Sequence, residues 1–109
     1  MKLILTLSIA CGLMAASLAH AAVDGDAAQA LMKSSGCLGC HAVDKKKVGP
    51  AFKDVAKKYK GNAEAEDKVY KQITAKPMVE IEGNKEEHRA IKSSDPAQIK
   101  NVVQWILAQ

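Results

Sequence analysis

The sequence predicts a small all-α domain that follows a short N-terminal leader. Apolar side chains recur every three or four residues in four separate stretches, which is the period of an amphipathic helix. Capping residues stand before these stretches and breakers between them. No stretch alternates apolar and polar residues for long enough to predict a half-buried strand. We therefore expect about four helices and no second domain.

The leader has the three parts of a secretory signal. A charged start at Lys2 precedes an apolar run from Leu3 to Leu18, and small residues occupy Ala19 and Ala21. We expect cleavage after Ala21, export to the periplasm and a mature domain over residues 22–109. The run is short for a membrane span and lacks a basic flank after it, so no stable membrane insertion is expected. A retained N-terminal anchor is the alternative.

The first predicted helix runs from a cap at Asp24 or Asp26 to about Ser34, and Gly36 is placed to end it. Its inward side is expected to hold Ala27, Ala30 and Leu31. After the break at Gly49-Pro50, a second short helix covers residues 52–59. A third begins with the acidic turn of residues 64–67 and ends near Ala75.

Residues 76–94 show no sustained period, with only Val79 and Ile81 hinting at a short extended piece. So long an irregular stretch in a small domain calls for a functional reason. A final helix then starts at Ser94 or Asp95, with Pro96 in its first turn. Its apolar stripe consists of Ile99, Val102, Val103, Ile106 and Leu107, with Trp105 on the flank.

The mature chain is poor in the large side chains that build a core. The sequence has one Trp, one Phe and two Tyr, and domains of this size usually recruit disulfides, a metal or a cofactor. Cys11 leaves with the leader, so only Cys37 and Cys40 remain. The formal net charge is +4, and lysines cluster at residues 45–47 and 57–60. These clusters favour acidic protein partners, whereas nucleic-acid binding is not expected because no aromatic side chains interleave the basic stretches.

The chemistry-bearing motif is Cys37-Leu38-Gly39-Cys40-His41. Two thiols one turn apart can each form a thioether to a porphyrin, and the adjacent imidazole then reaches one face of its iron. The motif therefore predicts one covalently attached haem c. Three alternatives are weaker. A redox dithiol of the thioredoxin kind would need strands beside it, and the flanks are helical. A structural zinc site would need a second pair of ligands. An ordinary surface histidine at position 41 is improbable because Cys37 and Cys40 adjoin it.

The segments from Gly36 to Asp44 and from Val48 to Ala56 resemble the small bacterial branch of the class I monohaem c-type cytochromes, and the Trp105-Ile106-Leu107 end resembles that family's last helix. The resemblance implies a small cytochrome c fold, with about four helices around one haem. It assigns to Pro50 a backbone carbonyl that orients the His41 ring. It also implies that the first and last helices pack around Ala30, Leu31, Val102 and Trp105.

In that family the second axial ligand is usually a methionine in the loop just before the last helix. Met78 is the candidate by residue type, but it follows the third helix almost at once. His88 lies at intervals that resemble the family's far better, so we favour His88 over Met78 as the second ligand. Imidazole is a competent haem ligand, and a bis-histidine pair would lower the reduction potential. Carboxylates in the same stretch would lower it further if they are not solvated.

The predicted function is the shuttling of single electrons between redox partners by a periplasmic haem protein. Lys33 and Lys45–Lys47 are the expected contacts with acidic partners, and the oligomeric state stays open. The alternative is a haem-based binder or sensor of NO or CO whose distal ligand, His88, dissociates. No catalytic acid, base and nucleophile converge in the sequence, so an enzyme is not expected.

Overall fold

The computed structural model describes residues 22–109, and the predicted leader with its cleavage point and Cys11 lies outside the described residues. None of the helices in this range is long and apolar enough to cross a membrane. The elements follow one another in the order α1 (Gly25–Ser34), the 3-10 turn η1 (Cys37–Gly39), α2 (Phe52–Tyr59), α3 (Ala65–Thr74), β1 (Met78–Ile81), β2 (Asn84–Glu87) and α4 (Pro96–Leu107).

The four helices lie where the sequence predicts them, and the capping carboxylates expected for α1 and α4 form their hydrogen bonds. The Asp24 carboxylate accepts a hydrogen bond from the Ala27 N–H at 3.0 Å, and the Asp95 carboxylate accepts one from the Ala97 N–H at 2.9 Å. Gly36 ends the first helix in the left-handed region, at φ 79°. Capping residues and breakers in this sequence therefore fix the helix boundaries.

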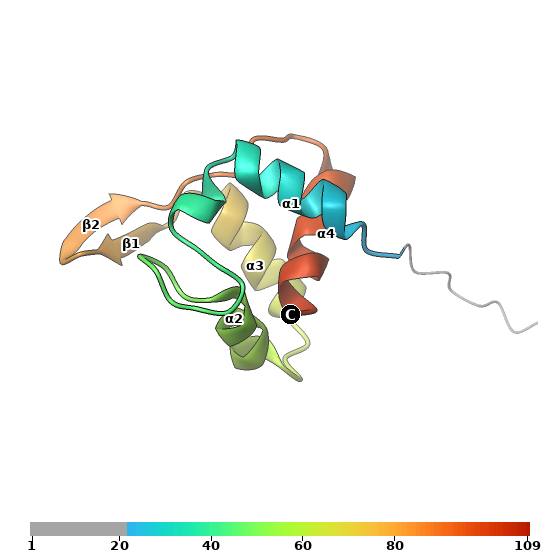
Figure 1. The fold of residues 1–109 in the computed structure, drawn as a ribbon, viewed down its shortest axis with the longest axis horizontal. Helices are drawn as coiled ribbons and strands as arrows, with labels where there is room; N and C mark the ends of the chain where they lie inside the picture. The colour runs from blue at the N-terminus through green and yellow to red at the C-terminus, as the bar shows by residue number, and fades with distance from the viewer. Residues whose placement is uncertain (1–21) are drawn as a thin grey trace, which may run out of the picture.

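Helix α4 is the centre of the packing, since α1, α2 and α3 all contact it. Figure 1 shows α1 lying across α4. Two hydrogen bonds of 2.8 Å join the backbone of Asp24 to the Asn101 side chain, and Gly25 lies close to the Trp105 ring. The buried core cluster consists of Ala28, Met32, Phe52, Val69, Ile73, Ile91, Ile99, Val102, Val103 and Ile106.

The inward side of α1 differs from the expected one. Ala28 and Met32 are fully buried, whereas Ala27 and Ala30 are exposed and Leu31 is half-buried. The expected contribution of Ala30 to the crossing of the first and last helices is therefore wrong. Several alanines occupy neighbouring positions of this helix, so the apolar pattern alone does not select one face; burial of the long Met32 side chain does.

The irregular stretch expected before the last helix contains an antiparallel hairpin of β1 and β2. Met78 pairs with Glu87, and Ile81 pairs with Asn84. The two central turn residues, Glu82 at φ 50° and Gly83 at φ 82°, both have positive φ, as a type I′ turn requires. The hairpin projects away from the crossing of α1 and α4 (Figure 1). The fold is thus helix-dominated with one small hairpin.

We expect Met32→Ala to lower the free energy of unfolding of the haem-loaded protein by about 2–5 kcal/mol, because it opens a cavity where α1 packs in the core. Met32 is 0% exposed. Guanidinium denaturation followed by circular dichroism measures the change. The exposed control Lys100→Ala should stay within about 0.5 kcal/mol of the unmodified protein. Equal stability of Met32→Ala and the control would show that this side chain does not hold the helices together.

Candidate haem-binding site

The attachment motif forms one tight turn directly after α1. The Cys40 and His41 N–H groups both donate to the Cys37 carbonyl, at 3.1 and 3.0 Å, and this closes the 3-10 turn η1. Both thiols are free and half-buried. Burial raises the pKa of the Cys37 thiol. The turn therefore gathers two thiols and an imidazole within one short segment.

The His41 ring is held on two sides. Its Nδ1 lies 2.7 Å from the Pro50 carbonyl oxygen. Because a carbonyl only accepts, Nδ1 must carry the ring proton, which leaves the Nε2 lone pair for a metal. The Phe52 ring stacks on the imidazole with centroids 5.3 Å apart and an interplanar angle of 19°, and Phe52 in turn meets Trp105 edge-on.

Backbone hydrogen bonds fix the segment that carries Pro50. The Gly49 N–H donates to the Cys40 carbonyl at 2.7 Å, and the Phe52 N–H donates to the Ala42 carbonyl at 2.9 Å. Gly49 therefore passes directly beside the imidazole of His41. A Cβ built on Gly49 would lie 2.9 Å from both ring nitrogens, closer than real Cβ atoms approach other groups. Only a glycine fits here without displacing the ring.

We expect Gly49→Ala to destabilise the haem-loaded protein by about 1–3 kcal/mol, because the added methyl group must push the His41 ring away from the Pro50 carbonyl. Denaturant unfolding of the oxidised protein measures this cost. Gly39→Ala is the matched control, since a Cβ at Gly39 meets nothing within 4 Å. If both variants unfold at the same denaturant concentration as the unmodified protein, the close approach of Gly49 has no energetic consequence.

His88 follows strand β2 and faces the attachment turn. Its N–H donates to the Pro77 carbonyl at 2.8 Å, which extends the hairpin pairing by one residue. Its ring centroid lies 6.2 Å from that of His41, with an interplanar angle of 49°. Burial lowers the pKa of His88, which favours the neutral imidazole that binds metals. The His88 Nδ1 is buried and has no hydrogen-bond partner among the described residues.

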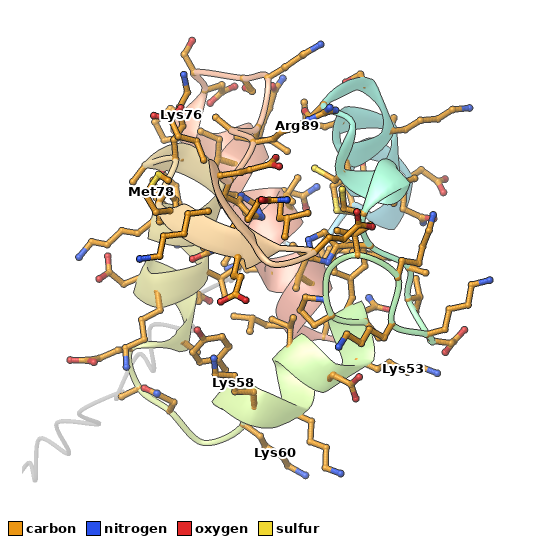
Figure 2. All side chains as sticks on the ribbon, turned by 90° about the vertical axis from the view of Figure 1, so that its left-hand side faces the viewer. Lys53, Lys58, Lys60, Lys76, Met78 and Arg89 are labelled. Atoms are coloured by element: carbon orange, nitrogen blue, oxygen red, sulfur yellow. The ribbon has the colours of Figure 1, made fainter. Side chains whose placement is uncertain are left out.

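Met78 lies on the other face of the hairpin. Successive side chains of a strand point to opposite faces. The pairing of Met78 with Glu87 therefore puts both on the face opposite to His88, while Val79 shares the face of His88. Met78 is 61% exposed, and Figure 2 shows it at the outer side of the hairpin. The hairpin thus brings His88 toward His41 and turns Met78 away.

These residues fit a haem between the two imidazoles. A histidine nitrogen binds a transition metal at about 2.0 Å, so two imidazoles on opposite sides of one metal have ring centroids roughly 6 Å apart. The His41 and His88 centroids are 6.2 Å apart. A buried polar atom without a partner, such as His88 Nδ1, is typical of a site that a further group completes. The fold and this site define a small helical protein that attaches one haem covalently.

The comparisons with known proteins agree with this class. The family model described as Cytochrome c matches residues 25–109, and the chain belongs to the cytochrome c family. It is therefore a class I monohaem c-type cytochrome. The family binds one covalent haem c, and Cys37 and Cys40 have the spacing of its attachment motif. The members of this family that it resembles are electron carriers.

Two relatives and two solved structures illustrate the likeness. Cytochrome c-551 of Allochromatium vinosum is 42% identical over 71% of this chain and 80% of its own length. Cytochrome c-551 of Pseudomonas aeruginosa is 51% identical, over 41% of this chain and only 43% of its own length. The class 1 cytochrome MtoD of Sideroxydans lithotrophicus superimposes with a TM-score of 0.76 at 45% identity, covering 80% of this chain and 97% of that one. Wild-type cytochrome c552 of Nitrosomonas europaea gives a TM-score of 0.57 at 29% identity, covering 72% and 95%.

Two features of the site are not predicted by the sequence. Gly49 was predicted only as a chain break, although its lack of a Cβ leaves room for the His41 ring. Phe52 was predicted only as a helix residue, although it stacks on that ring. Both follow from the return of residues 49–52 to a position beside the attachment turn, and no local pattern encodes that return.

Proposed function

We propose that this chain is a periplasmic electron carrier whose haem iron has two histidine ligands, His41 and His88. Residues 1–21 would direct its export and be removed after Ala21, which leaves residues 22–109 as the working domain. Family membership supports electron transfer and favours it over the gas-binding alternative. We propose the His41 and His88 pair separately, because methionine is the usual second ligand in this family.

The observation that carries the axial pair is the 6.2 Å between the His41 and His88 ring centroids. This separation leaves room for one metal ion between the rings. The hairpin pairing supports the same assignment, since it directs His88 inward and Met78 outward. Burial also lowers the pKa of His88, which favours the neutral imidazole that binds metals.

Two contacts hold the His41 ring in one orientation. When bound, haem supplies an iron that exchanges one electron between its ferric and ferrous forms. The Pro50 carbonyl holds the proton on His41 Nδ1 and thereby fixes the tautomer of the ring. Phe52 stacks against the same ring and prevents its rotation. Rigid ligands lower the reorganisation energy of each electron transfer.

Two histidine ligands favour the ferric state relative to a histidine–methionine pair, so we expect a comparatively low reduction potential. The carboxylates of Glu80, Glu82, Glu86 and Glu87 lie on the hairpin or its turn and are exposed, so salt screens most of their effect. The expected partners are redox proteins with acidic surfaces, which would meet Lys33 and Lys45–Lys47 beside the attachment turn. One of these is partly engaged already, because Lys47 Nζ donates to the Leu38 carbonyl at 2.9 Å.

Visible and near-infrared spectra of the oxidised and reduced protein test this proposal. We expect six-coordinate spectra in both states, no thioether-to-iron band in the oxidised near-infrared region, and no change when carbon monoxide is added. A thioether-to-iron band would show that Met78, and not His88, is the second ligand. Binding of carbon monoxide to the unmodified protein would instead support the gas-binding alternative.

A further inference from the structure

The two proposed axial ligands are held in different ways. The Nδ1 atom of His41 lies 2.7 Å from the Pro50 carbonyl oxygen, and the Phe52 ring stacks on the same imidazole. The Nδ1 atom of His88 is buried and has no hydrogen-bond partner within residues 22–109. The position of the His88 ring therefore depends on the backbone segments that lie before and after it.

The segment before His88 is a weak support. The His88 N–H donates to the Pro77 carbonyl at 2.8 Å, which joins it to the base of the hairpin. Each strand of this hairpin has only four residues, and every residue of β2 is exposed. A two-stranded hairpin on its own is at best marginally stable in water. The hairpin alone is therefore not expected to keep a ligand in one place.

The segment after His88 returns to the helical body at two points. The Ile91 N–H donates to the Ile73 carbonyl at 2.8 Å, near the end of α3, and the Ile91 side chain is buried. The Lys92 N–H donates to the Ser35 hydroxyl, also at 2.8 Å. Figure 1 shows this segment passing α1 on its way from β2 to α4. The second contact therefore joins it to the end of α1.

Ser35 occupies a special position in the fold. It directly follows the last residue of α1 and stands two residues before Cys37. It is 3% exposed, and among residues 22–109 it is the one buried polar side chain. Its partner Lys92 lies 57 positions further along the chain. A buried hydroxyl is costly unless it is hydrogen-bonded, so this long-range bond is a fixed part of the packing.

Gly36 lets the same two segments pack closely. It has a positive φ of 79°, and a Cβ built on it would lie 2.7 Å from Arg89 Nη1. Arg89 directly follows His88, and Figure 2 shows it beside the end of α1. Residues 35 and 36 therefore contact the segment after His88 at both of its ends.

We propose that the Ser35 hydroxyl is a positioning group for the second axial ligand. By holding Lys92 beside the attachment turn, it keeps His88 at the haem iron and slows its replacement by external ligands. The contact with Ile73 fixes the same segment to α3, whereas the contact with Ser35 fixes it to the turn that carries the haem. The inference rests on the proposed ligation of the iron by His88.

The test uses the oxidised, haem-loaded protein and potassium cyanide, with cyanide binding followed by visible absorption. At saturating cyanide the observed rate is the rate at which the second axial ligand leaves the iron. Ser35→Ala should raise this limiting rate about fivefold, because one buried hydrogen bond is lost. Ser34→Ala is the matched control, since the exposed Ser34 hydroxyl donates at 2.9 Å to the Leu31 carbonyl of its own helix. Its limiting rate should change less than about twofold.

Met32→Ala separates positioning from a general loss of stability. It removes a fully buried side chain from the same helix and is expected to destabilise the protein more than Ser35→Ala does. If the release of His88 simply followed global stability, Met32→Ala would bind cyanide fastest. We expect the opposite order, with Ser35→Ala faster than Met32→Ala.

An unchanged limiting rate in Ser35→Ala, an equal rise in Ser34→Ala, or faster binding in Met32→Ala would overturn the proposal. Failure of the His88 ligation itself is recognised separately. The near-infrared spectrum of the oxidised, unmodified protein would then show a thioether-to-iron band before any cyanide is added.

Discussion

A Cys37→Ala, Cys40→Ala double variant is expected to carry no covalently bound haem, against one haem per chain in the unmodified protein. Each thioether bond needs one of the two thiols, and residues 22–109 contain no other cysteine. We also expect the variant to lose most of its cooperative unfolding transition, because a domain with so few large apolar residues depends on the porphyrin to complete its core. Mass spectrometry of the denatured chain measures the haem content directly.

Leu38→Ala is the matched control for this pair. Leu38 lies between the two cysteines in the same turn and is 38% exposed, so its truncation should leave the haem content at one per chain. Haem that stays attached in the double cysteine variant after denaturation would show that another side chain forms the covalent bond. Loss of haem in Leu38→Ala would instead indicate that the turn as a whole, and not its thiols, decides attachment.

His88→Ala is expected to remove one axial ligand and open the iron to carbon monoxide. His88→Met should instead retain six coordination and raise the reduction potential by roughly 100 mV or more, because axial ligands tune haem potentials over about 0.8 V and a thioether favours ferrous iron. Carbon monoxide difference spectra and a spectroelectrochemical titration measure the two effects. Met78→Ala should change neither, since Met78 is exposed on the outer face of the hairpin.

The contrast between the two alanine variants decides the assignment. If Met78→Ala opens the iron while His88→Ala leaves the spectra unchanged, the hairpin must rearrange when haem is attached. If neither variant binds carbon monoxide, another residue provides the second ligand.

The helices were predictable because their signals are local. Asp24 and Asp95 cap the helices that follow them, and the apolar period reports the buried side wherever large side chains define it. In α1 that period is ambiguous, since alanines surround the helix, and the expected inward side was wrong at Ala30. The hairpin gave too weak a signal, because every residue of β2 is exposed and its strands are only four residues long.

The attachment turn was predictable for the same reason, since Cys37, Cys40 and His41 are neighbours in the chain. The remaining site depends on contacts between distant segments. The approach of Gly49 to His41 and that of His88 to the same ring both arise from chain reversals that no residue period encodes. Spacing along the chain nevertheless selected His88 over Met78, and the pleat of the hairpin supports the same choice through an independent physical argument.

X-ray absorption at the iron edge of the oxidised, haem-loaded protein tests the proposed axial pair most directly, because it counts nitrogen and sulfur ligands. We predict six nitrogen ligands at about 2.0 Å, four from the porphyrin and one each from His41 and His88. A sulfur ligand at about 2.3 Å would contradict the His41 and His88 pair and identify Met78 as the second ligand.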